Sequence, residues 1–390
     1  MDKINFLIIV ICLTMMTSCF HSGQVKNKEW AAHTNLFQLQ FSGTTKVEID
    51  TETSDMFMNL QFTVFDEQPL LIALNDHDNS LRVFDMDSLK QIKKIVYEQK
   101  GGDGVGVIHG FYYHRPDSIF IYSYWDMILF RTNEQGKILE KYPFKTSTGF
   151  DVKMPYPFVQ TSSPMRKINN EIVMNGFILS EVDSEETNNM PFTTCYNLKT
   201  RQLSYINRYP EQYSKYHWGG GMLFRLVHHT VNRNNEMILS FAADHRIFVF
   251  SFDDRTVQNY YGGSSSIKNI KSSTSRKGYI LSREMQMEHY LHTPSYEGIF
   301  HDPYRNVYYR VARLPIDDSI DLEEMALPKP VIVIVLNEKF EYIGETIMPK
   351  NIDFITNNCF VTKEGLHIQV YLDDDDEDHI TFYTYQLAKR

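Results

Sequence analysis

A single hairpin pattern recurs along this chain, and its recurrence limits the possible folds more than any other feature. The segment 81–97 reads as an apolar strand, a polar turn at residues 85–88 and a second strand. The pattern returns four times and a lone apolar strand ends the chain, the segments being 127–142, 193–206, 247–261, 331–343 and 380–387. Recurrence of one supersecondary unit is the signature of a repeat architecture.

Each hairpin lies within a longer unit of three or four predicted strands. The six units span residues 59–97, 107–142, 158–206, 223–261, 297–348 and 354–386. The last unit lacks a fourth strand, while short strand candidates at 36–39 and 45–50 precede the first unit. Joining the two ends would close a ring and remove the exposed sheet edges. The sequence therefore predicts an all-β fold, a six-bladed β-propeller closed by an N-terminal strand that completes the last blade.

Other folds fit the pattern less well. A seventh blade is the main alternative, if the region 278–290 contains a degenerate one, whereas a two-sheet sandwich would need far fewer strands. The 24 tyrosines and 26 phenylalanines favour β structure, because aromatic side chains suit half-buried pleated surfaces. We expect residues 36–390 to form a single propeller domain.

The first 35 residues have a different character. Lys3 precedes an apolar stretch at 4–16 that is too short for a comfortable membrane span and is typical of a signal peptide. It ends in Met-Thr-Ser-Cys at residues 16–19, which resembles a bacterial lipobox. We therefore expect residues 1–18 to be a lipoprotein signal peptide, Cys19 to carry lipid, and residues 19–35 to be a tether. The alternative is an ordinary secretory signal in which Cys19 is incidental.

Two cysteines remain in the predicted propeller. Cys195 lies in the third predicted blade and Cys359 in the last, so they would face each other across a six-fold ring. A disulfide needs Cα atoms within about 7 Å. We therefore expect two free, buried thiols.

The overall charge narrows the range of partners. The formal net charge is -10, and no basic stripe with interleaved aromatic residues interrupts it. Nucleic-acid binding depends on a basic face, so we expect no nucleic-acid partner. The expected partners are the membrane, through the lipid, and a protein, peptide or glycan.

The stretch EGIFHDPYRNVYYR at residues 297–310 is the most specific motif in the chain. Together with the lipobox and the six predicted blades, it resembles a Bacteroidetes-type group of propeller lipoproteins known only as a domain of unknown function. More distantly the chain is similar to TolB-like and NHL-type six-bladed propellers. The resemblance implies the fold and an outer-membrane location, but it supplies no catalytic residue. Residues 20–24 lack the acidic residues that such proteins carry when displayed outside the cell, which favours a periplasm-facing position.

Three stretches resemble cofactor or metal motifs, and each fails on spacing. The glycine-rich segment 101–106 matches neither a P-loop nor a dinucleotide fingerprint. Consecutive acids at 373–378 point in different directions along an extended turn, whereas Ca²⁺ needs a cage of oxygen ligands. The histidines show no metal-binding spacing. We therefore expect no cofactor and no metal.

The remaining candidates are side chains on or near the predicted inner strands. Trp218 and Arg310 illustrate the choice, because Trp218 either stacks on a sugar or packs between blades, and Arg310 either binds a carboxylate or belongs to a structural hairpin. The candidate ligand contacts are His109, Tyr112, Trp218, Arg225, His228, Tyr296 and Arg310.

These candidates suggest a membrane-anchored binding or scaffold protein more than an enzyme. An alternative is a propeller hydrolase or lyase that uses His and Arg side chains at the central channel, which clustered His and carboxylate groups with shifted pKa values would indicate. A charge-poor, aromatic channel mouth would indicate binding. A third possibility is a purely structural subunit, which a large exposed apolar patch would support.

Overall fold

The computed structural model describes residues 23–30, 34–144, 155–177, 189–273, 280–317, 329–372 and 378–390. The predicted signal peptide, Cys19 and most of the acidic turn 373–378 lie outside these ranges. No helix within them is long and apolar enough to cross a membrane.

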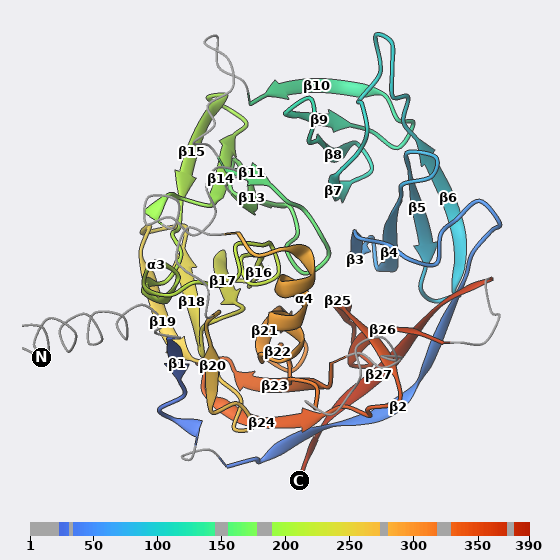
Figure 1. Ribbon diagram of the computed structural model, residues 1–390. Helices are drawn as coiled ribbons and strands as arrows, with labels where there is room; N and C mark the ends of the chain where they lie inside the picture. Colours follow the sequence, from blue (N-terminus) through green and yellow to red (C-terminus); the bar gives the residue numbers. More distant parts are fainter. Residues whose placement is uncertain are drawn as a thin grey trace, which may run out of the picture.

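Four antiparallel sheets follow one another along the chain and form most of a ring (Figure 1). The first contains β3 (Leu60–Phe65), β4 (Gln68–Asn75), β5 (Ser80–Asp85) and β6 (Lys90–Val96), and the second β7 (Gly110–Arg115), β8 (Ser118–Ser123), β9 (Ile128–Thr132) and β10 (Ile138–Pro143). The third contains β11 (Tyr156–Pro157), β12 (Arg166–Ile168), β13 (Glu171–Phe177), β14 (Thr193–Asn197) and β15 (Gln202–Ile206). The fourth contains β16 (Val227–Val231), β17 (Glu236–Phe241), β18 (Arg246–Ser251) and β19 (Val257–Tyr261).

An eight-stranded sheet completes the ring. Its order is β21-β22-β23-β24-β2-β27-β26-β25. The strands are β21 (Ser295–Asp302), β22 (Val307–Arg313), β23 (Val331–Asn337), β24 (Tyr342–Ile347), β25 (Asp353–Val361), β26 (Leu366–Tyr371), β27 (His379–Lys389) and the N-terminal β2 (Phe37–Glu48). The pairing of β2 with β27 extends from Phe37 with Lys389 to Glu48 with His379, as the sequence predicted. A single parallel pair, Phe37 with Gly344, joins β2 to β24.

The all-β, propeller-like arrangement agrees with the prediction, whereas six separate blades are not what the pairing shows. Four sheets are separate, and the predicted fifth and sixth blades share one sheet because β2 bridges them. The region suspected of hiding a seventh blade instead forms helix α4 (Arg283–Leu291), whose N-cap Ser282 accepts from the backbone N–H of Met285. Figure 1 shows α4 over the middle of the ring.

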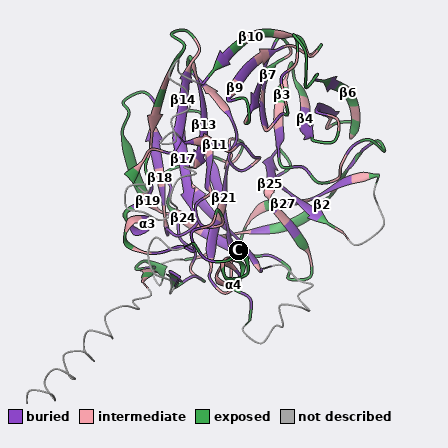
Figure 2. Ribbon diagram, turned by 45° about the horizontal axis from the view of Figure 1, so that its top comes forward, coloured by how far each residue is buried: buried purple, intermediate pink, exposed green. Residues whose placement is uncertain are grey.

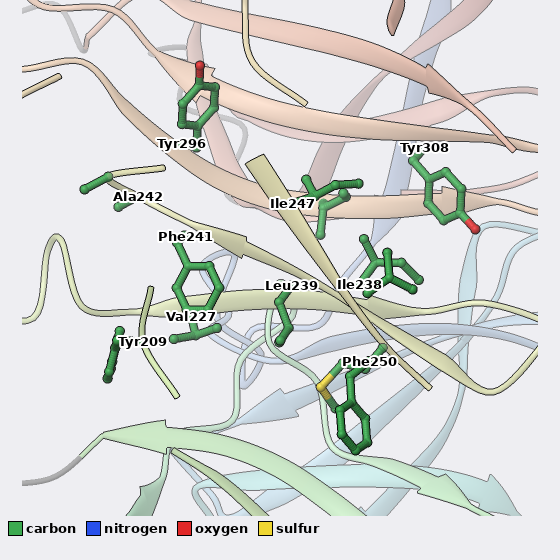
Figure 3. Packing of buried hydrophobic residues seen from close by; sticks show 14 of the residues in the cluster. Tyr209, Val227, Ile238, Leu239, Phe241, Ala242, Ile247, Phe250, Tyr296 and Tyr308 are labelled. Atoms are coloured by element: carbon green, nitrogen blue, oxygen red, sulfur yellow. The ribbon is translucent and has the colours of Figure 1, made fainter. Parts of the chain in front are cut away.

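The middle strands of the sheets are almost wholly buried, while the outermost strands are partly exposed. Every residue of β8 is buried. In contrast, β6 alternates between exposed and covered positions, as Figure 2 shows. Packing sheets face to face around a ring covers both sides of the middle strands, so their sequences read as continuous apolar runs. Figure 3 shows the largest cluster, in which Phe241 and Ile247 pack between neighbouring sheets.

Two further findings concern the predicted thiols and the tether. Cys195 and Cys359 are both buried and free, as the sequence predicted. Part of the range 19–35, which we expected to be a tether, instead forms β1 (Gln24–Lys26), which pairs with β20 (Asn269–Lys271). Asn27 secures this segment by donating to the carbonyls of Ser264 and Ile267. A short helix, α3 (Glu211–Lys215), precedes the fourth sheet.

Candidate functional site

The third predicted unit begins at residue 158, but the structure has a loop there. The strand β11 ends at Pro157 and β12 begins at Arg166, so residues 158–165 lie between strands. The backbone N–H of Thr161 donates to the carbonyl of Met58 at 3.0 Å, and its hydroxyl donates to Asn358 at 2.8 Å. These partners lie beside β3 and in β25. We call residues 158–165 the channel loop, because it links inner segments from across the ring.

Two consecutive histidines of β16 hold the channel loop. The hydroxyl of Ser162 lies 2.8 Å from Nδ1 of His228, and the backbone N–H of His229 donates to the carbonyl of Ser162 at 2.9 Å. Asn175 lies 2.9 Å from Nδ1 of His229. Burial lowers the pKa of His228 to about 4 and that of His229 to about 3, so both rings are neutral at pH 7.

A pocket of about 290 Å³ opens below the channel loop, at the C-terminal ends of the inner strands β16, β21 and β25. Its walls carry aromatic rings and neutral polar groups. They are Leu60, Gln61, Phe62, Thr63, Val64, Thr161, Pro164, Arg166, His229, Thr230, Val231, Ile299, Phe300, His301, Pro303, Tyr304, Cys359, Phe360 and Val361. This lining contains no aspartate or glutamate, although the chain as a whole carries a net charge of -10. We call it the mouth pocket.

Arg166 supplies the mouth pocket with its formal positive charge. Its guanidinium carbon lies 5.6 Å from the centre of the Tyr112 ring, and Nη1 donates to the carbonyl of Met165 at 3.1 Å. Within the described part of the chain, it forms no ion pair with a carboxylate. Burial lowers the pKa of this guanidinium. Sequence reasoning predicted Tyr112 but missed Arg166, which lies in the interval between two predicted strands and carries no motif.

Further aromatic groups form the rim of the mouth pocket. The rings of His301 and Tyr308 stack with 4.9 Å between their centres. Burial and the nearby charge of Arg233 lower the pKa of His301 to about 4, so this ring is also neutral at pH 7. Tyr304 is 39% exposed at the turn between β21 and β22, which places an accessible aromatic ring beside the pocket.

The predicted contacts Tyr296 and Arg310 lie together, but in the interior. Arg310 donates to the Ser240 hydroxyl and to the carbonyls of Phe241, Asp244, His245 and Gly262. Both side chains are fully buried. The structural alternative for Arg310 therefore accounts for every one of its donor groups, and its predicted contact with a ligand stays untested.

Trp218 and Arg225 are also buried, in the cluster around the fourth sheet. Trp218 is 1% exposed, and its indole N–H donates to the carbonyl of Gln212 at 3.1 Å. Arg225 lies with its guanidinium carbon 5.4 Å from the centre of the Tyr209 ring. The indole thus packs between structural elements, which was one of the two possibilities that the sequence left open.

His109 belongs to a separate aromatic surface above the second sheet. Its ring lies 6.0 Å from that of Trp125, which is 73% exposed, and its Nδ1 accepts from the backbone N–H of Tyr124 at 3.1 Å. Sequence reasoning did not single out Trp125, because its position in a turn does not by itself reveal whether its side chain is exposed. The seven predicted contacts therefore do not form one site in the molecule.

The other end of the ring carries a buried charged cluster beneath α4. Glu297 accepts from Arg313 at 3.3 Å and from the Tyr290 hydroxyl at 2.9 Å. Lys329 is 3% exposed and donates to the carbonyls of Tyr290 and Thr293, each at 2.6 Å. Burial lowers the pKa of Lys329 to about 7. Glu297 is satisfied by Arg313 and Tyr290, and Lys329 by two backbone carbonyls, so the cluster fixes α4 across this end.

A larger hollow of about 920 Å³ lies beside α4, with His289, His292 and Asp317 in its wall. Its lining includes Ser273 and Asp317, at the limits of two described ranges, so we base the candidate site on the mouth pocket. No group of three or more His, Cys, Asp or Glu side chains within the described ranges is arranged to hold a metal ion.

Several solved structures are similar to this chain, and two of them, with TM-scores of 0.76 and 0.50, agree with its architecture. A crystal structure of a DUF4221 family member from Bacteroides vulgatus matches with a TM-score of 0.76 and 21% identity, covering 92% of this chain and 100% of that one. A putative exported protein from Bacteroides fragilis matches with a TM-score of 0.50 and 10% identity, covering 91% and 96%. The WD40 repeats of RRP9 match with a TM-score of 0.44 and 10% identity, covering 89% and 100%. No curated protein shows a significant match.

The family comparison covers most of the chain. The model described as "Domain of unknown function (DUF4221)" matches residues 36–347, a range that includes the motif at 297–310 and the walls of the mouth pocket up to Tyr304. The resemblance seen in the sequence is thereby confirmed at the level of the family. The chain belongs to the DUF4221 family.

Proposed function

We propose that this protein is a binding module of the bacterial cell envelope that holds its ligand in the mouth pocket. The observation that carries the proposal is the composition of that pocket, whose walls are aromatic and neutral apart from Arg166. Ligand sites are typically concave and apolar, with a few placed polar groups that fix orientation. A volume of about 290 Å³ suits a small molecule or the end of a chain.

The state of the nearby histidines supports binding over catalysis. A general acid or base works best when its pKa lies near the operating pH. His228, His229 and His301 have pKa values lowered to about 4, 3 and 4, so each stays neutral near pH 7 and is poorly matched to that pH as a general acid or base. The alternative of a hydrolase or lyase would need an acid–base pair that the described walls of the pocket do not contain.

We also propose a number of blades and the extent of the domain. The eight-stranded sheet consists of two four-stranded halves that meet at one parallel pair, Phe37 with Gly344. We count these halves as two blades, which makes a six-bladed propeller with β2 as the outermost strand of the last blade. The residues 36–390 then form one domain.

The proposed location is the periplasmic side of the outer membrane, with lipid on Cys19. The lipobox-like segment at 16–19 supports this anchor, because several acyl chains on one residue give stable attachment. Mass spectrometry of the protein purified from membranes is expected to find an acylated Cys19 as the first residue. Cys19→Ser should release the protein from the membrane fraction, and retention of that variant would contradict the anchor.

Binding is tested by capture from envelope extracts with the full-length lipoprotein and two matched variants. Tyr304→Ser removes an exposed ring at the mouth pocket, and Trp125→Ser removes an exposed ring from the other end of the inner strands. We expect one partner, peptide or glycan to be recovered with the wild type and the Trp125 variant, and to be reduced at least tenfold with the Tyr304 variant. Equal recovery with all three proteins would exclude the mouth pocket as the binding site.

A further inference from the structure

We infer that Arg166 anchors a carboxylate group of the ligand in the mouth pocket. This inference rests on the proposed binding function and adds the chemical class of the ligand. Its basis is a part-buried positive charge in a pocket whose lining contains no group of opposite charge.

Arg166 is part-buried, and it has no carboxylate partner among the described residues. Arginine is almost never buried unless it is paired, because leaving water is costly for an ion. Arg82 meets Asp50 and Asp78, Arg305 meets Asp302, and Arg313 meets Glu297. Arg166 has one hydrogen bond, to the carbonyl of Met165, and the Tyr112 ring beside it. The described residues therefore provide a cation in the pocket wall but no carboxylate that pairs with it.

The position of Arg166 in a pocket wall distinguishes it from the fully buried arginines. Arg225 is 3% exposed and leaves Nε and Nη2 without a partner, but it lines no described pocket. Arg310 also lacks a carboxylate partner, but five hydrogen bonds to one hydroxyl and four carbonyl oxygens satisfy it. Arg310 is fully buried and lines no described pocket, whereas Arg166 lies in the wall of one. The guanidinium of Arg166 thus keeps donors for an external acceptor.

The chemistry of the pocket favours a monocarboxylate. A guanidinium presents two parallel N–H groups that match the two oxygens of a carboxylate. The walls contain no second lysine or arginine, so a single negative charge is what they balance. The neutral His229 and Thr230 and the ring of Phe300 suit the uncharged remainder of the ligand. Such a carboxylate belongs either to an acidic sugar or to the C-terminus of a peptide.

Calorimetry with paired probes tests the inference and separates the two sources. One pair is glucuronate and glucose, and the other is N-acetyl-alanyl-alanine and its C-terminal amide. We expect the wild type to bind at least one acid, and to bind the matching uncharged probe at least tenfold more weakly. Inorganic phosphate should bind more weakly than the preferred acid.

Two variants assign the effect to Arg166. Arg166→Met keeps the apolar stem on Tyr112 and removes the charge, and should weaken binding of the preferred acid by about 10- to 100-fold. Arg283→Met removes an exposed charge from α4 and should leave that affinity unchanged. Because Arg166→Met removes an uncompensated charge, its unfolding temperature without ligand should equal or exceed that of the wild type.

Three results would overturn the inference. The first is that the wild type binds neither acid. The second is that Arg166→Met binds the acid as tightly as the wild type does. The third is that Arg166→Met is much less stable than the wild type. Failure of the proposed binding function can be distinguished from failure of this inference. If envelope capture is lost in Tyr304→Ser but kept in Arg166→Met, the mouth pocket is a binding site and its anchor is not Arg166.

Discussion

The guanidinium carbon of Arg310 lies 3.8 Å from the centre of the Tyr296 ring, and both side chains are completely buried. Arg310 reaches from β22 of the eight-stranded sheet into the fourth sheet, where the turn between β17 and β18 supplies most of its acceptors. The Tyr296 hydroxyl continues this link by bonding His245 at 2.7 Å. Two neighbouring sheets are thus joined by one arginine and one tyrosine.

Arg310→Met should reduce the free energy of unfolding by at least about 3 kcal/mol, because buried acceptors left without a donor cost about 1–3 kcal/mol each. Chemical denaturation measures the difference. Arg310→Lys should recover only part of it, since one ammonium cannot reach all five oxygens. Arg283→Met serves as the exposed control and should stay within about 0.5 kcal/mol of the wild type. A mild effect of Arg310→Met would show that the link between the sheets is not structural.

Acid should destabilise the protein through its buried histidines. Folding lowers the pKa of His228 to about 4 from an ordinary value near 6.5, so the unfolded chain binds more protons between these pH values. Stability is therefore complete above about pH 6.5 and falls as the pH decreases toward 4. Each such histidine contributes at most about 1.4 kcal/mol per pH unit.

The histidine effect is measured by repeating the denaturation series from pH 7 to pH 4.5. His228→Gln keeps a polar partner for Ser162 but cannot titrate, so its stability should depend less steeply on pH than that of the wild type. His379→Gln changes a histidine whose side chain is only partly buried, and provides the control. Equal slopes for the wild type and the His228 variant would contradict the assignment.

The two buried thiols should be inert in the folded protein. Burial raises the pKa of the Cys195 thiol to about 12 and raises that of Cys359 further, so neither forms the reactive thiolate near neutral pH. Iodoacetamide labelling at pH 8 followed by mass spectrometry is expected to modify neither residue in the native state and both in denaturant. Rapid native labelling of Cys195 or Cys359 would show that its surroundings open readily.

Lys329 should hold the C-terminal end of α4 in place. Its ammonium donates to the carbonyls of Tyr290 and Thr293 and lies 3.9 Å from the centre of the Tyr290 ring. Lys329→Met removes both donors while keeping the length of the stem, so amide hydrogens of residues 283–293 should exchange faster, by about tenfold or more. Hydrogen exchange in the first sheet is the internal control. Unchanged protection of α4 would show that other contacts suffice to fix it.

The strand pattern was predictable because it is local. Strands such as β5 and β18 alternate with polar turns in the sequence, and their middle positions carry aromatic and branched residues that favour sheets. The pairing of β2 with β27 was predictable for a related reason, since an incomplete last unit and a spare first strand complete each other. The channel loop was not predictable, because its hydrogen-bond partners are distant in sequence. They are the carbonyl of Met58, the side-chain amide of Asn358 and the backbone N–H of His229, which lie in or beside other sheets.

By itself, the sequence determined the all-β repeat, the order of its strand units, the closure by the N-terminal strand and the free state of the two thiols. Only the tertiary structure decided which charged side chains are satisfied. Arg166 and Arg310 look alike in the sequence, yet Arg310 meets acceptors 48 to 70 positions away, and Arg166 meets one neighbouring carbonyl. The physical reason is that hydrogen bonding and desolvation depend on which distant turns the packed sheets bring together, and local sequence does not encode that proximity.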